Sequence, residues 1–536
     1  MRSIDPVPKG LRILVVVLLV ATISLRFSAL DRHVFWLDEV VNAWHVSGYS
    51  KLELGTQLQE EYGGVFAVRD LLAYQYPTSE TTWLDTIAVL ARGEPQSPPL
   101  YYLISRWWIQ LFGNAIAVAR SVSATISLLV FPGMFWLAWE WTRSRTVAWL
   151  AMGLVAVSPI QFLFAIEFRP YVLWVVTLLL ASATFLRAMR SNGRKSWLAY
   201  AASTVVGLYA FPLTGLVTIS HGIYVAIIER LRVTKRAIFY LVSVAIALLL
   251  YSPWIWQILQ IDSEKMSDWR TSNLEPLVLL NSWISNFSVA FVDFNRDRGL
   301  SANLLAIFDN NFLLLFLALA SIGLTLYAFY VLYRHTQKSI WLFVFLLAGV
   351  PAAILTLPDL ILGGQRSSVA RYFFPCYIGI QLSVAYLFAR QIDPNKNRDR
   401  VVKFWKVAAA FVLSLGLASC SQISRSPYWW PKAYNKNNTA IAETIEQAEN
   451  PLVITASNSW SFGNLSSIAY NLDTQTQVML LPDYNIPALD MEAYKAFLFY
   501  PETSFDQIDS QQPLRLNLAR QQGPFFLFEL EAANSE

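Results

Sequence analysis

The chain has 536 residues, of which 55% are hydrophobic and 15% are charged, and its mean hydropathy is +0.40. This composition is too apolar for a soluble protein of that size and predicts a polytopic membrane protein. The formal net charge of +4 excludes little, because in a membrane protein the distribution of Lys and Arg among the loops matters more than their sum.

Apolar runs predict about eleven membrane-spanning helices, since roughly 20 apolar residues are needed to cross the hydrocarbon core. The first run follows "MRSIDPVPKGLR" and is interpreted as an uncleaved span, because no small-x-small cleavage site precedes "DRHVFW". The predicted spans lie near residues 11–30, 115–140, 146–164, 171–188, 197–211, 213–229, 237–258, 311–333, 340–357, 372–389 and 404–420.

The charges of the loops predict the orientation in the membrane. If the N-terminus is cytoplasmic, every inside connection is short and basic, as the positive-inside rule requires. The inside segments are then "WTRSRT", "RAMRSNGRKSW", "ERLRVTKR", "YRHTQKS" and "RQIDPNKNRDRVVK". The long first loop, a second long loop from 259 to about 310 and everything after Cys420 are then outside the cytoplasm.

Two outer regions have recognisable structure. In the first loop, "PLYYLISRWWIQLFG" has apolar residues at helical spacing, which predicts an amphipathic helix lying flat at the membrane interface. After the last span, "PLVITAS" and "QVMLLP" predict strands beside the helix "NTAIAETIEQAE". The predicted fold is therefore mainly α, with a transmembrane domain at 1–420, which includes the first outer loop 31–113, and a small extracytoplasmic α/β domain at 421–536. Cys376 and Cys420 indicate no disulfide framework.

Ionisable residues next to spans are costly and are functional hypotheses by default. In the predicted topology they gather at the outer ends of the spans, as Asp38, Glu39, Arg120, Glu167, Arg169, Arg366 and Arg371. Structural explanations stay open for five of them. The adjacent acids could cap a helix beginning near "DEVVNAWHV", Glu167 and Arg169 could form an ion pair at headgroup level, and Arg371 could snorkel from a helix end.

Taken together, the same residues indicate group transfer at a membrane surface. A carboxylate near the interface suits the removal of a proton from a hydroxyl, because desolvation favours its protonated form. Arginines bind phosphate through bidentate, charge-assisted hydrogen bonds. A carboxylate base, a phosphate clamp and a lipid-facing site fit transfer from a lipid-linked phosphate donor to an acceptor outside the cytoplasm.

The motifs resemble those of a known family. "WLDE" after the first span, "SPPLYYLISRWWIQLFGNAIAVARSVSA", "EFRPYVLW" and "ARYFFP" are similar, in this order, to segments of GT-C-fold membrane glycosyltransferases. The resemblance is specifically to the protein O-mannosyltransferases and the bacterial aminoarabinose transferases. It covers residues 1 to about 420 and is most specific in the first half.

This resemblance implies a sugar donor linked to polyprenyl phosphate, transfer on the extracytoplasmic side and inversion at the sugar carbon. It makes Asp38 the catalytic base, with Glu39 supporting it and Glu167 at a second acidic position. A divalent metal held by Asp38 and Glu167 is compatible with the pattern, although nothing in the residues requires a metal or another cofactor. The predicted substrate-binding residues are Tyr101, Arg120, Arg169, Tyr171, Arg366, Arg371 and Tyr372.

The sequence departs from the family pattern in two places. Ser97 stands where relatives often have His before the Pro-Pro pair, and "LYAFPLTG" lacks the His-aromatic pair often found in that turn. The C-terminal domain matches no motif, so the acceptor stays open as a lipid, a glycan or a protein.

The leading hypothesis is an integral-membrane glycosyltransferase of a bacterial inner membrane. No feature points to nucleic acid as a partner. A multipass transporter or flippase of lipid-linked or envelope precursors is the alternative, but it predicts interrupted half-helices, an internal repeat and a site near the midplane of the bilayer. A catalytically silent scaffold for envelope assembly is a further alternative.

Overall fold

The computed structural model describes residues 7–62, 64–260, 273–395, 397–482, 485–500, 509–511, 513–522 and 525–532. Part of the second predicted outer loop, residues 261–272, and the last residues of the C-terminal domain lie outside these ranges. The chain divides into two compact units. Unit 1 comprises Met1–Leu30, Gln96–Tyr101 and Arg120–Arg425, and unit 2 comprises Asp31–Pro95, Tyr102–Ala119 and Ser426–Glu536.

This division differs from the predicted one. The first outer loop was expected to belong with the spans, but most of it groups with the C-terminal domain in unit 2. The reason is a strand in the loop, β1 (Val65–Ala67), which pairs antiparallel with β3 (Gln477–Leu481) of the C-terminal region.

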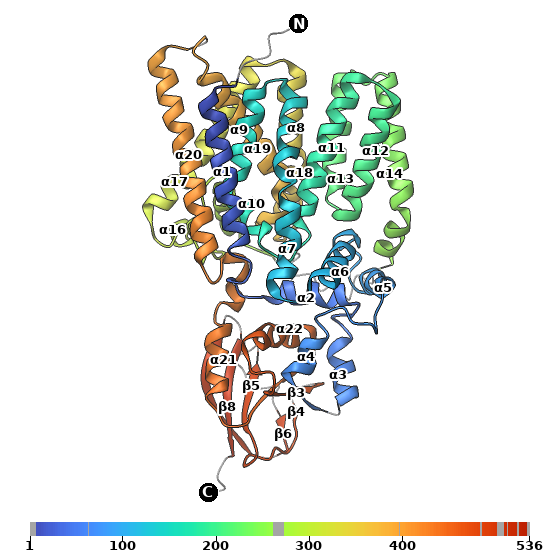
Figure 1. Ribbon diagram of the computed structural model, residues 1–536, viewed down its shortest axis with the longest axis vertical. Coiled ribbons are helices and arrows are strands. Elements are labelled where there is room, and N and C mark those ends of the chain that lie inside the picture. Colours follow the sequence, from blue (N-terminus) through green and yellow to red (C-terminus); the bar gives the residue numbers. More distant parts are fainter. Residues whose placement is uncertain are drawn as a thin grey trace. The chain divides into compact units, whose positions relative to one another are not determined.

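Unit 1 is helical, and most of its helices lie within the predicted spans, whereas residues 276–288 and 304–307 form two helices in the predicted second outer loop. The helices of unit 1 are α1 (Lys9–Phe27), α7 (Ile116–Ser127), α8 (Val130–Thr142), α9 (Arg145–Ala156), α10 (Pro159–Ala165), α11 (Tyr171–Ser191), α12 (Arg194–Ala210), α13 (Thr214–Ile228), α14 (Lys235–Leu259), α15 (Pro276–Ser288), α16 (Leu304–Ile307), α17 (Phe312–His335), α18 (Lys338–Leu362), α19 (Phe374–Gln391) and α20 (Asp399–Arg425). Within this unit α11, α12, α13 and α14 lie side by side (Figure 1).

The predicted number of eleven spans is not confirmed. Among the described residues, eight helices are long and apolar enough to cross a membrane, or nine if α9 and α10, bent by 58°, form one span. The predicted spans at 197–211 and 213–229 correspond to α12 and α13, and α13 is an apolar helix of only 15 residues. The turn at Phe211 and Pro212 separates these two helices.

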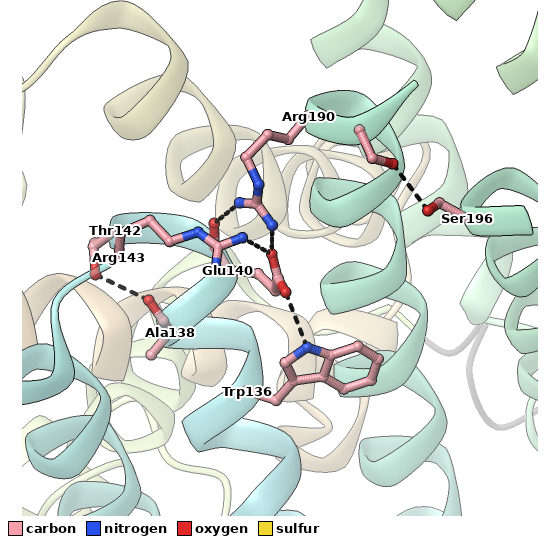
Figure 2. A network of polar contacts seen from close by, with 8 residues as sticks. Trp136, Ala138, Glu140, Thr142, Arg143, Arg190 and Ser196 are labelled. Atoms are coloured by element: carbon pink, nitrogen blue, oxygen red, sulfur yellow. Dashed lines mark hydrogen bonds and ion pairs between the residues drawn. The ribbon is translucent and has the colours of Figure 1, made fainter. Parts of the chain in front are cut away.

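Ion pairs with the buried carboxylate of Glu140 join α8 to α11 in unit 1 (Figure 2). The Glu140 carboxylate accepts a hydrogen bond from Trp136 Nε1 at 3.2 Å and pairs with Arg143 Nη2 at 2.7 Å. Arg190 of α11 pairs with the same carboxylate, and its Nη1 donates to the Glu140 carbonyl at 3.0 Å. Two of the basic segments predicted to lie inside are thus tied together by one acid.

Unit 2 contains a mixed six-stranded sheet with strand order β1-β3-β2-β5-β8-β7. Strand β2 (Pro451–Ala456) runs parallel to β3 and to β5 (Lys495–Tyr500), whereas β8 (Phe525–Ala532) is antiparallel to β5 and to β7 (Leu514–Gln522). The helices α21 (Asn438–Glu446) and α22 (Ser459–Ile468) pack on the sheet (Figure 1). The predicted small α/β domain is therefore confirmed.

The loop part of unit 2 is largely helical. It contains α2 (Leu37–Ser47), α3 (Leu54–Tyr62), α4 (Val68–Ala73), α5 (Trp83–Gly93) and, from Tyr102 on, α6 (Leu100–Phe112), which is the predicted amphipathic helix. Trp107, Leu111 and Phe112 of α6 are exposed, as expected of a helix whose apolar face contacts the membrane interface.

Candidate active site

The predicted phosphate-binding residues of unit 1 meet around the ring of Tyr171. Arg169 Cζ lies 5.6 Å from the ring centroid of Tyr171, and its Nη2 donates to the Tyr171 hydroxyl at 3.3 Å. Arg371 Cζ lies over the same ring at 5.5 Å and 5.8 Å from the ring of Tyr372. Two guanidinium groups that share an aromatic platform are suited to an anionic ligand, because stacking leaves donor groups at their edges.

The platform is held by packed aromatic side chains. Tyr171 is buried at the start of α11 and meets Phe164 and Phe211 edge-on, with ring centroids 5.2 Å and 5.5 Å away. Arg371 and Tyr372 lie in a short 3₁₀ turn, η3 (Ala370–Phe373), directly before α19. The segments "EFRPYVLW" and "ARYFFP", which are far apart in the sequence, are thus neighbours in space.

Tyr101 and Arg120, two of the predicted substrate-binding residues, are completely buried in unit 1. The fully buried Tyr101 hydroxyl is 2.8 Å from Ser123 Oγ, and Ser123 Oγ donates to the Arg169 carbonyl at 3.2 Å. The buried Arg120 donates from Nη1 to the Leu30 carbonyl at 2.9 Å. The contacts of Tyr101 and Ser123 position the turn that carries Arg169, and substrate binding by Tyr101 and Arg120 stays a prediction.

Glu167 lies in the same turn, between α10 and α11, and its side chain is completely buried. The carbonyl of Glu167 accepts a hydrogen bond from the Arg169 amide at 2.9 Å, so the backbone makes a tight turn between these two residues. Glu167 and the arginine platform therefore belong to one structural element.

Arg366 has a structural partner. Its Nη1 lies 3.4 Å from Oδ1 of Asp359, and the Asp359 carboxylate also accepts the amide hydrogen of Ser367 at 2.6 Å. Asp359 is buried near the end of α18. This ion pair fixes the loop that leads to Arg371, and the sequence did not indicate it because Asp359 lies in an apolar run.

An apolar cavity of about 420 Å³ lies in unit 1 between α15, α17, α18 and α19. Its wall includes six aromatic side chains, those of Trp283, Phe287, Phe329, Phe345, Phe373 and Tyr377. Phe373 is separated from Arg371 by a single residue, so the chain passes directly from the arginine platform to the wall of the cavity. A cavity of this size and lining can take an apolar chain.

The acidic pair "DE" of "WLDE" lies in the first turn of α2, in unit 2. Trp36 at the N-cap makes no side-chain capping bond, and both acids occupy positions where a negative charge favours the helix dipole. Asp38 is partly exposed, whereas Glu39 is completely buried. The two adjacent carboxylates therefore have different access to solvent.

Glu39 forms an ion pair inside unit 2. Lys432 Nζ lies 3.2 Å from Glu39 Oε2, and both side chains are completely buried. A buried carboxylate with a buried ammonium partner is held in place, because separating the two would leave uncompensated charge away from water. Sequence reasoning missed Lys432, since a lysine in "YWWPKAYN" is expected to be exposed.

The other end of α2 is also fixed. The helix stops at Gly48, which has a left-handed backbone with φ of 89°. Arg106 Nη1 donates to the Val46 carbonyl at 2.9 Å and to Thr86 Oγ1 at 3.2 Å, and burial lowers the pKa of Arg106. His45 Nδ1 lies 3.8 Å from Glu94 Oε2.

The described residues contain no group of three or more His, Cys, Asp and Glu side chains that could hold a metal ion. Asp38 belongs to unit 2 and Glu167 to unit 1. A metal ion between Asp38 and Glu167 therefore stays a prediction.

Comparison with known proteins gives a family match over part of the chain. Residues 96–256 match the model of a family described as dolichyl-phosphate-mannose-protein mannosyltransferase. This range includes "SPPLYY" and "EFRPY", and therefore Tyr101, Arg169 and Tyr171. A sequence comparison with curated proteins gives no match.

Solved structures match over nearly the whole chain. ArnT from Cupriavidus metallidurans bound to undecaprenyl phosphate is 12% identical with a TM-score of 0.50, and the match covers 96% of this chain and 98% of ArnT. AglB from Archaeoglobus fulgidus in complex with an inhibitory peptide and a dolichol-phosphate is 12% identical with a TM-score of 0.49, covering 92% of this chain and 69% of AglB.

The apolar helices of unit 1, the family match over residues 96–256 and the fold shared with ArnT agree with the interpretation of the motifs. The chain is an integral membrane protein with a GT-C fold, and its predicted resemblance to the protein O-mannosyltransferases and aminoarabinose transferases is confirmed.

Proposed function

We propose that the chain is an integral-membrane glycosyltransferase that moves a sugar from a polyprenyl-phosphate donor to a hydroxyl group of an acceptor. The observation that carries this proposal is the meeting of Arg169 and Arg371 on the ring of Tyr171. It brings together the predicted phosphate-binding residues of two distant motifs. The matches to a mannosyltransferase family and to ArnT bound to undecaprenyl phosphate support the same class of donor.

The donor phosphate binds the guanidinium groups of Arg169 and Arg371. The phosphate becomes the leaving group, and the two positive charges stabilise the negative charge that develops on it as the bond to the sugar breaks. The apolar cavity beside Phe373 takes part of the polyprenyl chain. Phosphate and lipid are then recognised by adjacent parts of unit 1.

Asp38 acts as the general base. It accepts the proton of the acceptor hydroxyl, the acceptor oxygen bonds to the sugar carbon, and the bond from that carbon to the phosphate oxygen breaks. The products are the glycosylated acceptor, polyprenyl phosphate and protonated Asp38, which then loses its proton to water. The partial exposure of Asp38 in α2 supports this assignment over Glu39, which is buried and ion-paired.

Transfer takes place on the extracytoplasmic side of a bacterial inner membrane, with the N-terminus in the cytoplasm. The basic residues of the alternate loops support this orientation. Labelling of single cysteines introduced into unit 2 with an impermeant reagent on intact cells tests it. Protection from the reagent would reverse the assigned orientation.

The function is tested by incubating the purified protein with polyprenyl-phosphate-linked sugars and candidate acceptors and measuring the release of polyprenyl phosphate. The proposal predicts release that depends on protein and on acceptor. No release with any donor, together with movement of the lipid-linked sugar across proteoliposome membranes, would instead support the transporter hypothesis.

A further inference from the structure

We infer that the C-terminal domain is a working part of the transfer site, and that Lys432 is the positioning residue through which it holds the helix of the catalytic base. The inference rests on the proposed function, because it takes Asp38 as the base. It gives the C-terminal domain a role that its sequence did not reveal.

The first observation is the pair of Glu39 and Lys432, which joins the first turn of α2 to η4 (Trp430–Asn435) of the C-terminal domain. Both side chains have no exposed surface, and their charged atoms are 3.2 Å apart. Glu39 directly follows Asp38 in the chain, so any shift of Glu39 moves the backbone of the base. A buried pair of this kind is sensitive to the loss of either partner.

The second observation is a network of hydrogen bonds around the same helix end. The Leu37 amide donates to Asn435 Oδ1 at 3.2 Å, and Asn435 Nδ2 donates to Asn464 Oδ1 at 3.0 Å. Asn438 Nδ2 donates to Ser467 Oγ at 2.7 Å, and Ser467 Oγ donates to the Phe35 carbonyl. The backbone on both sides of Trp36 is therefore held by side chains of the C-terminal domain.

The third observation is close packing of α2 on α22. The rings of Trp44 and Phe462 stack with centroids 5.0 Å apart and an interplanar angle of 6°. A Cβ atom at Gly463 would lie 2.4 Å from Leu37 Cδ1, so only glycine lets the helices approach this closely without movement of Leu37. Charge, hydrogen bonds and packing thus fix α2 on one domain, which is how rigid catalytic groups are supported.

The position of Asp38 therefore depends on the C-terminal domain, while the donor phosphate is bound by arginines of unit 1. Loss of Lys432 is expected to disturb the base without disturbing donor binding. A displacement of about 1 Å is enough to reduce turnover about 100-fold. The signature is a fall in kcat with little change in the KM for the donor.

The experiment uses the full-length protein and compares Lys432→Met, Lys432→Arg and the double variant Glu39→Gln/Lys432→Met with the parent. Lys432→Met is expected to lower kcat about 100-fold, with the KM for the polyprenyl-phosphate sugar within about twofold. Lys432→Arg is expected to keep most of the turnover, and the double variant to recover about tenfold over Lys432→Met, because no uncompensated charge is left.

The matched control is Lys495→Met, which breaks the ion pair with Glu529 between β5 and β8 of the same domain. It is expected to leave turnover unchanged. Full turnover in a folded Lys432→Met protein would overturn the inference, as would a loss that neither Lys432→Arg nor the double variant relieves.

Hydrogen exchange of the peptide spanning 35–47 separates this inference from the proposed function. Lys432→Met is expected to increase exchange in this peptide and not in α13, and Lys432→Arg is expected to restore protection. If the parent showed no transfer at all, the proposed function would fail, while the exchange result would still decide whether Lys432 holds α2. Unchanged exchange in Lys432→Met would contradict the inference.

Discussion

Arg371 lies over the ring of Tyr171, with its Cζ 5.5 Å from the ring centroid, and Arg169 approaches the same ring at 5.6 Å. The side chains come from opposite halves of the transmembrane part, and their meeting at one ring depends on the packing of η3 against the start of α11. In the proposed function this arrangement binds the donor phosphate.

Replacing Arg371 by Lys keeps the charge but removes the planar fork and its stacking on Tyr171. We expect the KM for the donor to rise about tenfold, which corresponds to about 1.4 kcal/mol, while kcat changes less. Steady-state release of polyprenyl phosphate measures both constants. Arg194→Lys, at an exposed arginine at the start of α12, is the matched control, and an equal effect there would remove the special role of Arg371.

Tyr171 is expected to act through its ring more than through its hydroxyl. Tyr171→Phe loses the hydrogen bond from Arg169 Nη2 but keeps the platform, so the KM for the donor should stay within about threefold of the parent. Tyr171→Leu removes the platform for both guanidinium groups and should raise that KM about tenfold. If the Phe variant were as impaired as the Leu variant, the hydroxyl itself would contact the substrate.

Gly55 is expected to be essential for joining the first loop to the C-terminal domain. A Cβ atom at this position would lie 2.2 Å from the carbonyl oxygen of Ser457, a backbone atom that cannot rotate away. We expect Gly55→Ala to destabilise unit 2 by about 1–3 kcal/mol and to lower its melting temperature. Gly323→Ala in α17, where a Cβ meets open space, should not lower it.

Glu140 is expected to stabilise unit 1 without contributing to catalysis. Glu140→Gln removes the charge that faces Arg143 and Arg190, whose side chains are 43% and 41% exposed. This exposure limits the expected loss to about 1 kcal/mol. The melting temperature should fall while the KM for the donor stays unchanged, and Glu443→Gln, at an exposed acid of α21, should change neither. A changed KM would show that these ion pairs affect the donor site.

Local patterns predicted much of the fold. The strands β2 and β3 follow from short apolar runs and the helix α21 from its amphipathic pattern, and most of the long apolar runs form helices of unit 1. The short strand β1 could not be predicted, because it contains only Val65–Ala67 and exists only through pairing with β3. The exact number of spans also escaped prediction, since α12 and α13 are short and meet at a Phe-Pro turn.

Residue types and motif order singled out Arg169, Tyr171 and Arg371, but they did not predict that both guanidinium groups approach the ring of Tyr171. The ion-pair partners of Arg366 and Glu39 were not predictable, because one lies in an apolar segment and the other is distant in the sequence. Asp359, which pairs with Arg366, lies within an apolar helix. Lys432, which pairs with Glu39, is 393 residues away from it in the sequence. Such pairs depend on tertiary packing, which a single sequence does not display.

The most direct test of the proposed mechanism is the turnover number of Asp38→Asn with a donor that the parent uses. The substitution keeps the shape of the side chain but removes the base, and a general base contributes about 10²–10⁴-fold to the rate. We expect kcat to fall by at least about 100-fold with the KM for the donor unchanged, whereas Asp31→Asn, at an exposed acid of the same loop, should be fully active. Full turnover by Asp38→Asn would contradict the assignment of Asp38 as the base.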